Sequence, residues 1–138
     1  MMEIISYLYL GVMYIVASIT DYRTREIPIP LFPSALVLYL VLNFGNVGLN
    51  SILGMLVMGL PLLVLSVKGK MGGGDLIMFA VTGFIVGFNN IPLFCACVSA
   101  VGTLYFVAVK FKNKVCPIAP LAMVAYFIFL TIVVVMKK

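Results

Sequence analysis

The sequence predicts an all-α, polytopic membrane protein, with residues 1–138 forming a single domain and about six helices crossing the bilayer. Hydrophobic residues make up 64% of the chain and charged residues only 9%, and the mean hydropathy is +1.27. A soluble domain needs more polar residues than this to cover its surface. The apolar residues also fall into long runs, and helices are expected there because an open strand in lipid leaves backbone groups unpaired.

Six apolar runs give the expected helices in chain order. They cover approximately residues 4–20, 31–44, 51–67, 75–88, 91–109 and 117–136. The first run is preceded by Glu3 and by no Lys or Arg, so it lacks the basic region of a cleavable secretory signal and is expected to be retained. Prolines at positions 28 and 30 hold an extended linker before the second run.

The second and fourth runs are short for membrane spans. A helix of about fourteen residues rises about 21 Å, whereas the hydrocarbon core of a bilayer is roughly 30 Å thick. We therefore expect these helices to extend into the flanking turns, or the membrane to be thin around them. In the fourth run, Gly83 and Gly87 are spaced for close packing against another helix.

Basic residues occupy alternate breaks between the runs, and this pattern predicts the orientation of the chain. These residues are Arg23 and Arg25, Lys68 and Lys70, and Lys110, Lys112 and Lys114. The other breaks, 45–50 and 89–90, carry no charge. Because basic loops stay in the cytoplasm, we expect the amino terminus outside and the three basic breaks inside. Lys137 and Lys138 oppose this orientation, but the loop charges outnumber them.

Charge and cysteine content bear on possible partners. The net charge of +5 comes from Lys and Arg in short breaks, which favours contacts with the lipid bilayer and argues against a nucleic-acid-binding face. Cys95, Cys97 and Cys116 occur without any His, so no metal site is expected and the thiols are interpreted as buried and apolar. No cofactor is expected either.

Only four acidic residues occur in the chain, and two of them have ordinary explanations. Glu3 and Glu26 lie near the ends of runs, beside water or basic neighbours. Asp21 and Asp75 instead lie at the edges of apolar runs, and the predicted orientation places both at the cytoplasmic face. These two carboxylates are therefore the candidate site residues.

Asp75 has a structural explanation as well as a functional one. An Asp after glycines at the start of a helix is a good N-cap. One glycine is enough for a turn, however, whereas Gly72, Gly73 and Gly74 together let a backbone come very close. The functional interpretation is that this glycine loop admits an extended peptide beside the carboxylate.

Asp21 is less easily explained by stability. At the carboxyl end of a helix the dipole disfavours a negative charge. Pairing with Arg23 or Arg25 would offset that cost.

The two acidic sites together resemble a known family. Asp21, followed by a basic residue and by Ile27-Pro28, and the GxGD sequence that ends at Asp75 resemble the type IV prepilin peptidase family of intramembrane aspartyl proteases. The resemblance extends over essentially the whole chain, including the proline-containing start of the last run, residues 116–121. GxGD alone is a weak pattern, but with the upstream motif at the same predicted membrane face it is fairly specific.

The resemblance implies that Asp21 and Asp75 are a catalytic pair and that the substrate is a prepilin-like membrane precursor. Such enzymes cut a short basic leader on the cytoplasmic side, after a glycine and just before the hydrophobic helix. Larger members carry a methyltransferase region, often with a tetracysteine zinc site. This chain has neither, and N-methylation is not expected. It looks more like the short peptidases of tight-adherence pilus or archaeal systems. Many members also have a Lys shortly after the GxGD acid, where this chain has Leu76-Ile77-Met78.

Two adjacent carboxyls that share a proton supply the base and the acid that peptide hydrolysis needs, without a metal. From the helix ends, Asp75 is expected to be the anion and Asp21 to hold the proton. The chain has no His, and Ser18 and Thr20 are expected to bond backbone carbonyls rather than act as nucleophiles.

Two alternative functions stay open at this point. One is a GxGD protease that acts on other membrane peptides, such as signal-peptide remnants. The other is a nonenzymatic membrane scaffold or transporter subunit, in which Asp75 is a helix cap and Asp21 pairs with Arg.

Overall fold

The computed structural model describes residues 2–24, 27–28, 30–45, 47–69, 72–109 and 118–136. Within these ranges the chain forms helices and no strand. The elements are α1 (Met2–Thr24), α2 (Leu31–Leu42), α3 (Leu49–Val67), α4 (Gly73–Val86), the 3-10 turn η1 (Phe88–Asn90), α5 (Ile91–Val109) and α6 (Ile118–Met136). The predicted all-α fold is confirmed, with a helix in each of the six expected runs.

Four segments are long and apolar enough to cross a membrane: Ile5–Thr24, Leu49–Val67, Phe88–Val107 and Ile118–Met136. The helices α2 and α4 are shorter, as expected from their runs. Large hydrophobic side chains are exposed on the outer faces of the bundle, where lipid can cover them. The chain is therefore a multi-pass membrane protein.

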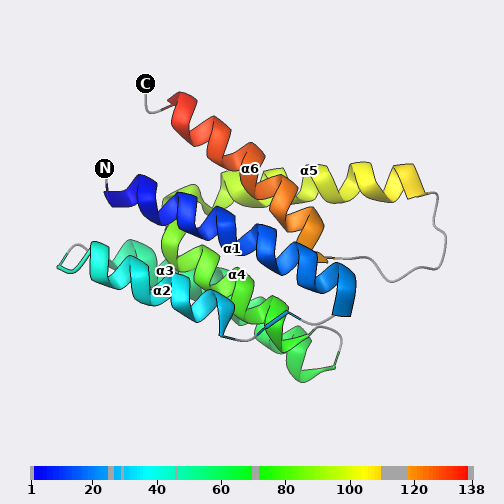
Figure 1. Ribbon diagram of the computed structural model, residues 1–138, viewed down its shortest axis with the longest axis horizontal. Coiled ribbons are helices and arrows are strands. Elements are labelled where there is room, and N and C mark those ends of the chain that lie inside the picture. Colours follow the sequence, from blue (N-terminus) through cyan, green and yellow to red (C-terminus); the bar gives the residue numbers. More distant parts are fainter. Residues whose placement is uncertain are drawn as a thin grey trace.

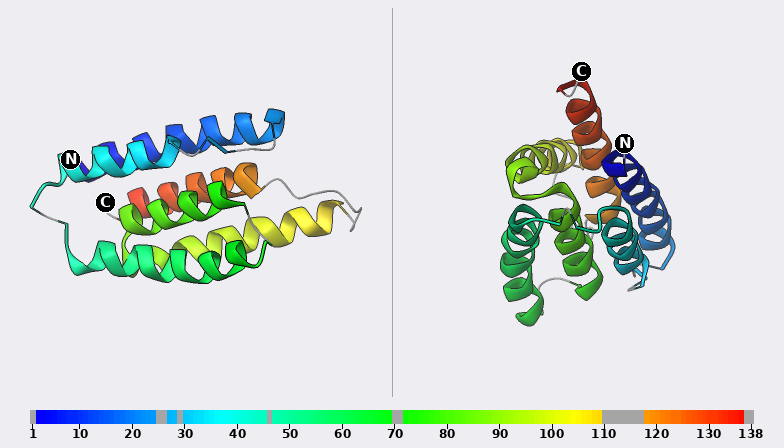
Figure 2. Two further views of the ribbon diagram at one scale, coloured as in Figure 1. Left: turned by 90° about the horizontal axis from the view of Figure 1, so that it is seen from below. Right: turned by 90° about the vertical axis from the view of Figure 1, so that its left-hand side faces the viewer.

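The helices form three layers of two (Figures 1 and 2). The helices α4 and α6 lie between α1 and α2 on one side and α3 and α5 on the other (Figure 2). Helix α3 packs along α4, α6 packs against both α1 and α5, and α2 bridges α1 and α4. Because α4 is enclosed, every residue from Val81 to Val86 is buried, which explains why this helix is apolar on all faces.

An aromatic core joins the layers. Tyr14 of α1 stacks on Tyr126 of α6 with ring centroids 4.9 Å apart, and meets Phe32 of α2 edge-on at 5.6 Å. Phe94 and Phe129 extend this cluster between α5 and α6, with centroids 5.7 Å apart. Edge-to-face and offset contacts of this kind add to the stabilisation from burial alone.

Helices α3 and α4 pack backbone against backbone where two glycines meet. A side chain at Gly54 would collide with the carbonyl oxygen of Gly83, and a side chain at Gly83 would collide with that of Gly54. The expected close packing at Gly83 is therefore confirmed, with α3 as the partner. Gly87 ends α4 with a positive φ of 76°, which a residue with a Cβ rarely adopts.

Two helix boundaries differ from the expected ones, and both affect the acidic residues. Helix α1 continues through Thr24, so Asp21 lies inside its last turns rather than after its end. The hydroxyl of Thr20 donates to the carbonyls of Val16 and Ala17, as expected for this residue. Helix α4 starts at Gly73, so Gly73 and Gly74 belong to its first turn rather than to an open loop.

The acidic residues come from helix ends that lie together. Helices α1, α3 and α5 end at the same end of the bundle at which α2, α4 and α6 begin (Figure 2). Two of the basic residues expected in the cytoplasmic breaks, Arg23 and Lys68, are exposed at this end. Arg25, Lys70 and the basic residues of 110–114 lie outside the described residues. Which side of the membrane this end faces stays a prediction.

Candidate active site

Asp21 lies near the carboxyl end of α1 and is partly buried. Arg23, in the same turn, is exposed and makes no ion pair with it in the described part of the chain. The other proposed partner, Arg25, lies outside the described residues. Asp21 is thus a partly buried negative charge at the end of a helix where the dipole does not favour it.

Asp75 is the third residue of α4 and is also partly buried. The N-cap of α4 is Gly72, and no side chain makes a capping hydrogen bond there. Asp75 therefore does not occupy the N-cap position considered for it. Its carboxylate folds back over Gly72, since a Cβ at Gly72 would lie 3.6 Å from Asp75 Oδ2.

The fold brings the two acids close enough to interact. Asp75 lies in the first turn of α4, outside the four segments long enough to span a membrane. Burial raises the pKa of the Asp75 carboxyl, and the nearby negative charge of Asp21 raises it further. Residues more than fifty positions apart in the chain thus form an electrostatically coupled pair.

The direction of this pKa shift is opposite to the expectation from the helix ends. The positive end of the α4 dipole favours an anionic Asp75. Burial and the charge of Asp21 favour the protonated form instead. These effects oppose that of the helix dipole, and which acid holds the shared proton stays a prediction.

The three glycines before Asp75 have different surroundings. A Cβ at Gly74 would lie 2.9 Å from the Cβ of Ile27 and 3.2 Å from its carbonyl oxygen. A Cβ at Gly73 would meet nothing within 4 Å. Gly74 therefore accommodates the linker that follows α1, while Gly73 faces open space beside the acid pair. An approach path for a peptide over Gly72 and Gly73 stays a prediction.

The contact between Ile27 and Gly74 joins the two sequence motifs. Ile27 belongs to the Ile-Pro pair after Asp21, and it also packs against the hydrophobic core. The linker is further held by a hydrogen bond from Leu31 N–H to the carbonyl of Pro28, 3.1 Å. Each motif therefore helps to position the acid of the other, because the linker after Asp21 covers the helix start that carries Asp75.

Tyr14 and Thr82 are buried polar residues that the sequence pattern did not single out. The hydroxyl of Tyr14 lies 2.7 Å from Thr82 Oγ1, so a hydrogen bond links α1 to α4 two turns away from the acids. The sequence feature that could have identified this pair is spacing: Tyr14 lies seven positions before Asp21, and Thr82 lies seven positions after Asp75.

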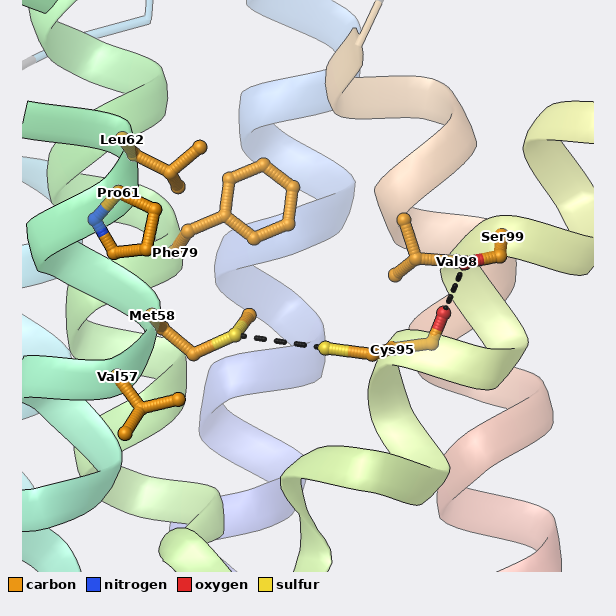
Figure 3. Close-up of a pocket in the computed structure, with 8 residues that line it drawn as sticks. All are labelled: Val57, Met58, Pro61, Leu62, Phe79, Cys95, Val98 and Ser99. Carbon is orange, nitrogen blue, oxygen red and sulfur yellow. Dashed lines mark hydrogen bonds between the residues drawn. The ribbon is translucent and has the colours of Figure 1, made fainter. Parts of the chain in front are cut away.

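A cavity of about 340 Å³ opens between α3, α4 and α5 (Figure 3). Its wall includes Phe79, one turn after Asp75, and Cys95, whose sulfur lies 3.8 Å from that of Met58. Cys95 is exposed here, so the expectation of a buried thiol was wrong for it, whereas Cys97 is buried as expected. Cys116 lies outside the described residues.

The described residues contain no cluster of three or more His, Cys, Asp or Glu that could hold a metal ion. The charged groups gathered at this end of the bundle, within the described ranges, are the two carboxyls and the exposed Arg23 and Lys68. The arrangement can therefore support proton transfer by paired carboxyls.

Comparison with known proteins identifies the family of this chain. The sequence model of the type IV leader peptidase family matches residues 8–107, which include both aspartates and extend from α1 to α5. No curated protein and no solved structure gives a significant match. Because the family match covers most of the chain, this membrane protein belongs to the type IV leader peptidase family.

Proposed function

We propose that this protein is an aspartic endopeptidase that removes the basic leader from type IV prepilin-like precursors, with Asp21 and Asp75 as the catalytic pair. The observation that carries the proposal is the coupling of these two carboxyls at one end of the bundle. Two partly buried acids that repel each other destabilise a fold, and such arrangements are typical of active sites.

The coupled pair is suited to hydrolyse a peptide bond through two proton transfers. Ionised Asp21 accepts a proton from water as the water oxygen attacks the peptide carbonyl carbon. Protonated Asp75 donates its proton to the carbonyl oxygen. When the tetrahedral intermediate collapses, Asp21 passes its proton to the leaving nitrogen and Asp75 recovers one from a hydroxyl. The products are a carboxyl and an amine, and the pair returns to its starting state.

The position of the pair fits a substrate with a soluble leader and a membrane helix. We place the pair at the cytoplasmic face of the cell membrane, because Arg23 and Lys68 lie at the same end of the bundle and basic loops stay inside. A basic leader is repelled by these two side chains but attracted by the negative charge of the pair. The leader therefore reaches the carboxyls while the precursor helix stays in lipid.

The described residues do not favour the nonenzymatic alternative. It required Asp75 as the cap of α4, but that position is held by Gly72. It also required an ion pair of Asp21 with Arg23 or Arg25; Arg23 makes none with Asp21, and Arg25 lies outside the described residues. No observation favours other membrane peptides over leader-bearing precursors.

The test is cleavage of a prepilin-like precursor by the full chain in membranes, followed by mass spectrometry of the new amino terminus. Each of Asp21→Asn and Asp75→Asn should slow cleavage by about 100- to 10,000-fold, because each removes one proton-transfer group. Glu3→Gln, the same chemical change at the start of α1, should leave the rate unchanged. If either Asp variant still cleaves at the wild-type rate with equal membrane levels, the pair is not catalytic.

A further inference from the structure

Tyr14 and Thr82 form a directed link between the two helices that carry the acids. Both side chains are fully buried, with 0% of their surface exposed. The Thr82 hydroxyl donates to the carbonyl of Met78 at 2.7 Å. Its one hydrogen is therefore used, so the Tyr14 hydroxyl donates to Thr82 Oγ1 across the 2.7 Å that separates them.

The position of this link matches that of the acid pair. Tyr14 lies seven residues before Asp21 in α1, and Thr82 lies seven residues after Asp75 in α4. Helices α1 and α4 run in opposite directions, since α1 ends where α4 begins (Figure 2). Seven residues rise about 10.5 Å and return to within about 20° of the same face of a helix. A link between 14 and 82 therefore brings 21 opposite 75.

We propose that Tyr14 and Thr82 are a positioning pair whose hydrogen bond sets the register of α1 against α4 and so holds Asp21 opposite Asp75. This inference rests on the proposed catalytic role of the two acids. A slip of one residue between the helices shifts one acid by about 1.5 Å along the axis and turns it by about 100°. The pair would then no longer face each other.

Apolar packing alone specifies this register poorly. Helix α1 packs mainly on α6 and α2 and touches α4 only sparingly. In contrast, a buried hydroxyl without a hydrogen-bond partner is destabilised by the full free energy of its desolvation. The Tyr14 and Thr82 hydroxyls therefore favour the one register in which they meet. The Tyr14 ring is itself held by stacking on Tyr126 and by the edge of Phe32, which fixes the direction of its hydroxyl.

Buried apolar side chains lie between the link and the acids. Ala17 lies between Tyr14 and Asp21 in sequence, and Met78 lies between Asp75 and Thr82; both are fully buried.

The chain supplies a matched control for this hydrogen bond. Tyr126 is also fully buried, and its hydroxyl donates to the carbonyl of Tyr7 at 2.7 Å. This bond joins α6 to α1 and does not involve α4. Tyr126→Phe thus removes the same kind of group from the same core without touching the register between α1 and α4.

The experiment compares four full-length variants on a prepilin-like precursor: Tyr14→Phe, Thr82→Val, Thr82→Ser and Tyr126→Phe. Tyr14→Phe and Thr82→Val should lower kcat about ten- to hundredfold with KM changed less than about twofold, because misplaced groups slow the chemical step. A fifth variant that combines Tyr14→Phe with Thr82→Val should be no slower than the slower of these two single variants, because both remove the same hydrogen bond. Thr82→Ser keeps the hydroxyl and should retain most of the rate. Tyr126→Phe should lower thermal stability to a similar degree with kcat within about twofold of wild type.

A second measurement tests the register of α1 against α4 by crosslinking and does not depend on cleavage activity. In a chain with Cys95, Cys97 and Cys116 replaced by Ala, Asp21→Cys and Asp75→Cys should crosslink readily with a short bifunctional reagent. Adding Tyr14→Phe should slow this crosslinking, whereas adding Tyr126→Phe should not. Slowed crosslinking, together with no cleavage of the precursor by the wild-type chain that retains both acids, would support the register and reject the proposed function. Wild-type kcat in both Tyr14→Phe and Thr82→Val, or an equal loss in Tyr126→Phe, would reject the positioning role.

Discussion

Polar side chains gather at both ends of the helix bundle, but their interactions differ between the two ends. At the end opposite the acids, a cavity of about 130 Å³ is lined by polar residues from four helices or turns and by parts of α4. Its polar lining residues are Tyr7, Tyr39, Asn50, Ser51 and Asn90. At the acid end, the described charged groups are Asp21 and Asp75 and the exposed Arg23 and Lys68. No residue that lines the cavity of about 130 Å³ is charged, so we call the region around that cavity the neutral end.

At the neutral end, the polar groups satisfy one another. The side-chain amide of Asn43 donates to Ser6 Oγ at 3.4 Å and to the carbonyl of Tyr39 at 3.1 Å. Asn50 accepts a hydrogen bond from the backbone N–H of Asn89 at 3.2 Å. These contacts close the helix ends and the loop between α4 and α5, which is a structural task.

At the acid end, like charges meet instead of donors and acceptors. Burial and the negative charge of Asp21 raise the pKa of Asp75, and neither carboxyl has an ion-pair partner in the described part of the chain. The comparison teaches that polar clustering at a helix end is not a functional signal by itself. The signal is a polar group whose surroundings leave it electrostatically unsatisfied.

The largest expected difference between the two ends is pH dependence. The raised pKa of Asp75 keeps its carboxyl protonated to a higher pH than an ordinary Asp, and catalysis uses this proton. Above that pKa the cleavage rate should fall about tenfold for each pH unit. A rate measured across pH that stays flat, or that rises through this range while the fold is intact, would contradict the role given to Asp75.

The same shift makes stability depend on pH. Because the folded state holds the Asp75 proton more tightly than the unfolded state, stability should be lost as pH rises from the ordinary Asp pKa to the raised one. Thermal unfolding in detergent should show this loss in the wild type and not in Asp75→Asn. Asn50→Ala, at the neutral end, should leave the pH dependence as it is.

A smaller effect is expected from the linker that covers the acid end. Gly74→Ala places a Cβ 2.9 Å from that of Ile27, so the linker after Asp21 must move. We expect cleavage to fall about tenfold, as displaced catalytic groups react more slowly. Gly102→Ala is the control, because a Cβ at this helical glycine of α5 meets nothing within 4 Å. Equal rates in the two variants would show that the contact with Ile27 does not position the pair.

The smallest effect is expected at the neutral end. Asn50→Ala removes the acceptor for the Asn89 N–H and should cost about 1 kcal/mol of stability. Cleavage by the folded protein should stay within about twofold of wild type, because no group of the acid end moves. A loss of rate as large as that of Gly74→Ala would mean that the two ends are coupled, and it would contradict a purely structural role for the neutral end.

Much of the fold was predictable from the sequence, because its causes are local. Apolar runs long enough to need lipid, and a backbone that must hydrogen-bond to itself there, predict the six helices. The same reasoning isolates Asp21 and Asp75, since an acid at the edge of an apolar run needs a special explanation. The end of α1 was harder to predict. Its apolar run stops at Thr20, but the helix continues to Thr24, because no residue before Pro28 breaks it.

Tertiary structure decided the features that depend on which helices face each other. Glycine is a poor helix former, yet Gly73 and Gly74 are helical, and Gly74 lets Ile27 pack against the first turn of α4. The helix dipole, a local property, favours an anionic Asp75, whereas burial and the charge of Asp21 raise the pKa of this carboxyl and act in the opposite direction. The link from Tyr14 to Thr82 likewise depends on register. Hydrophobicity and backbone hydrogen bonding act within one segment, but burial, register and charge coupling arise only when distant segments meet.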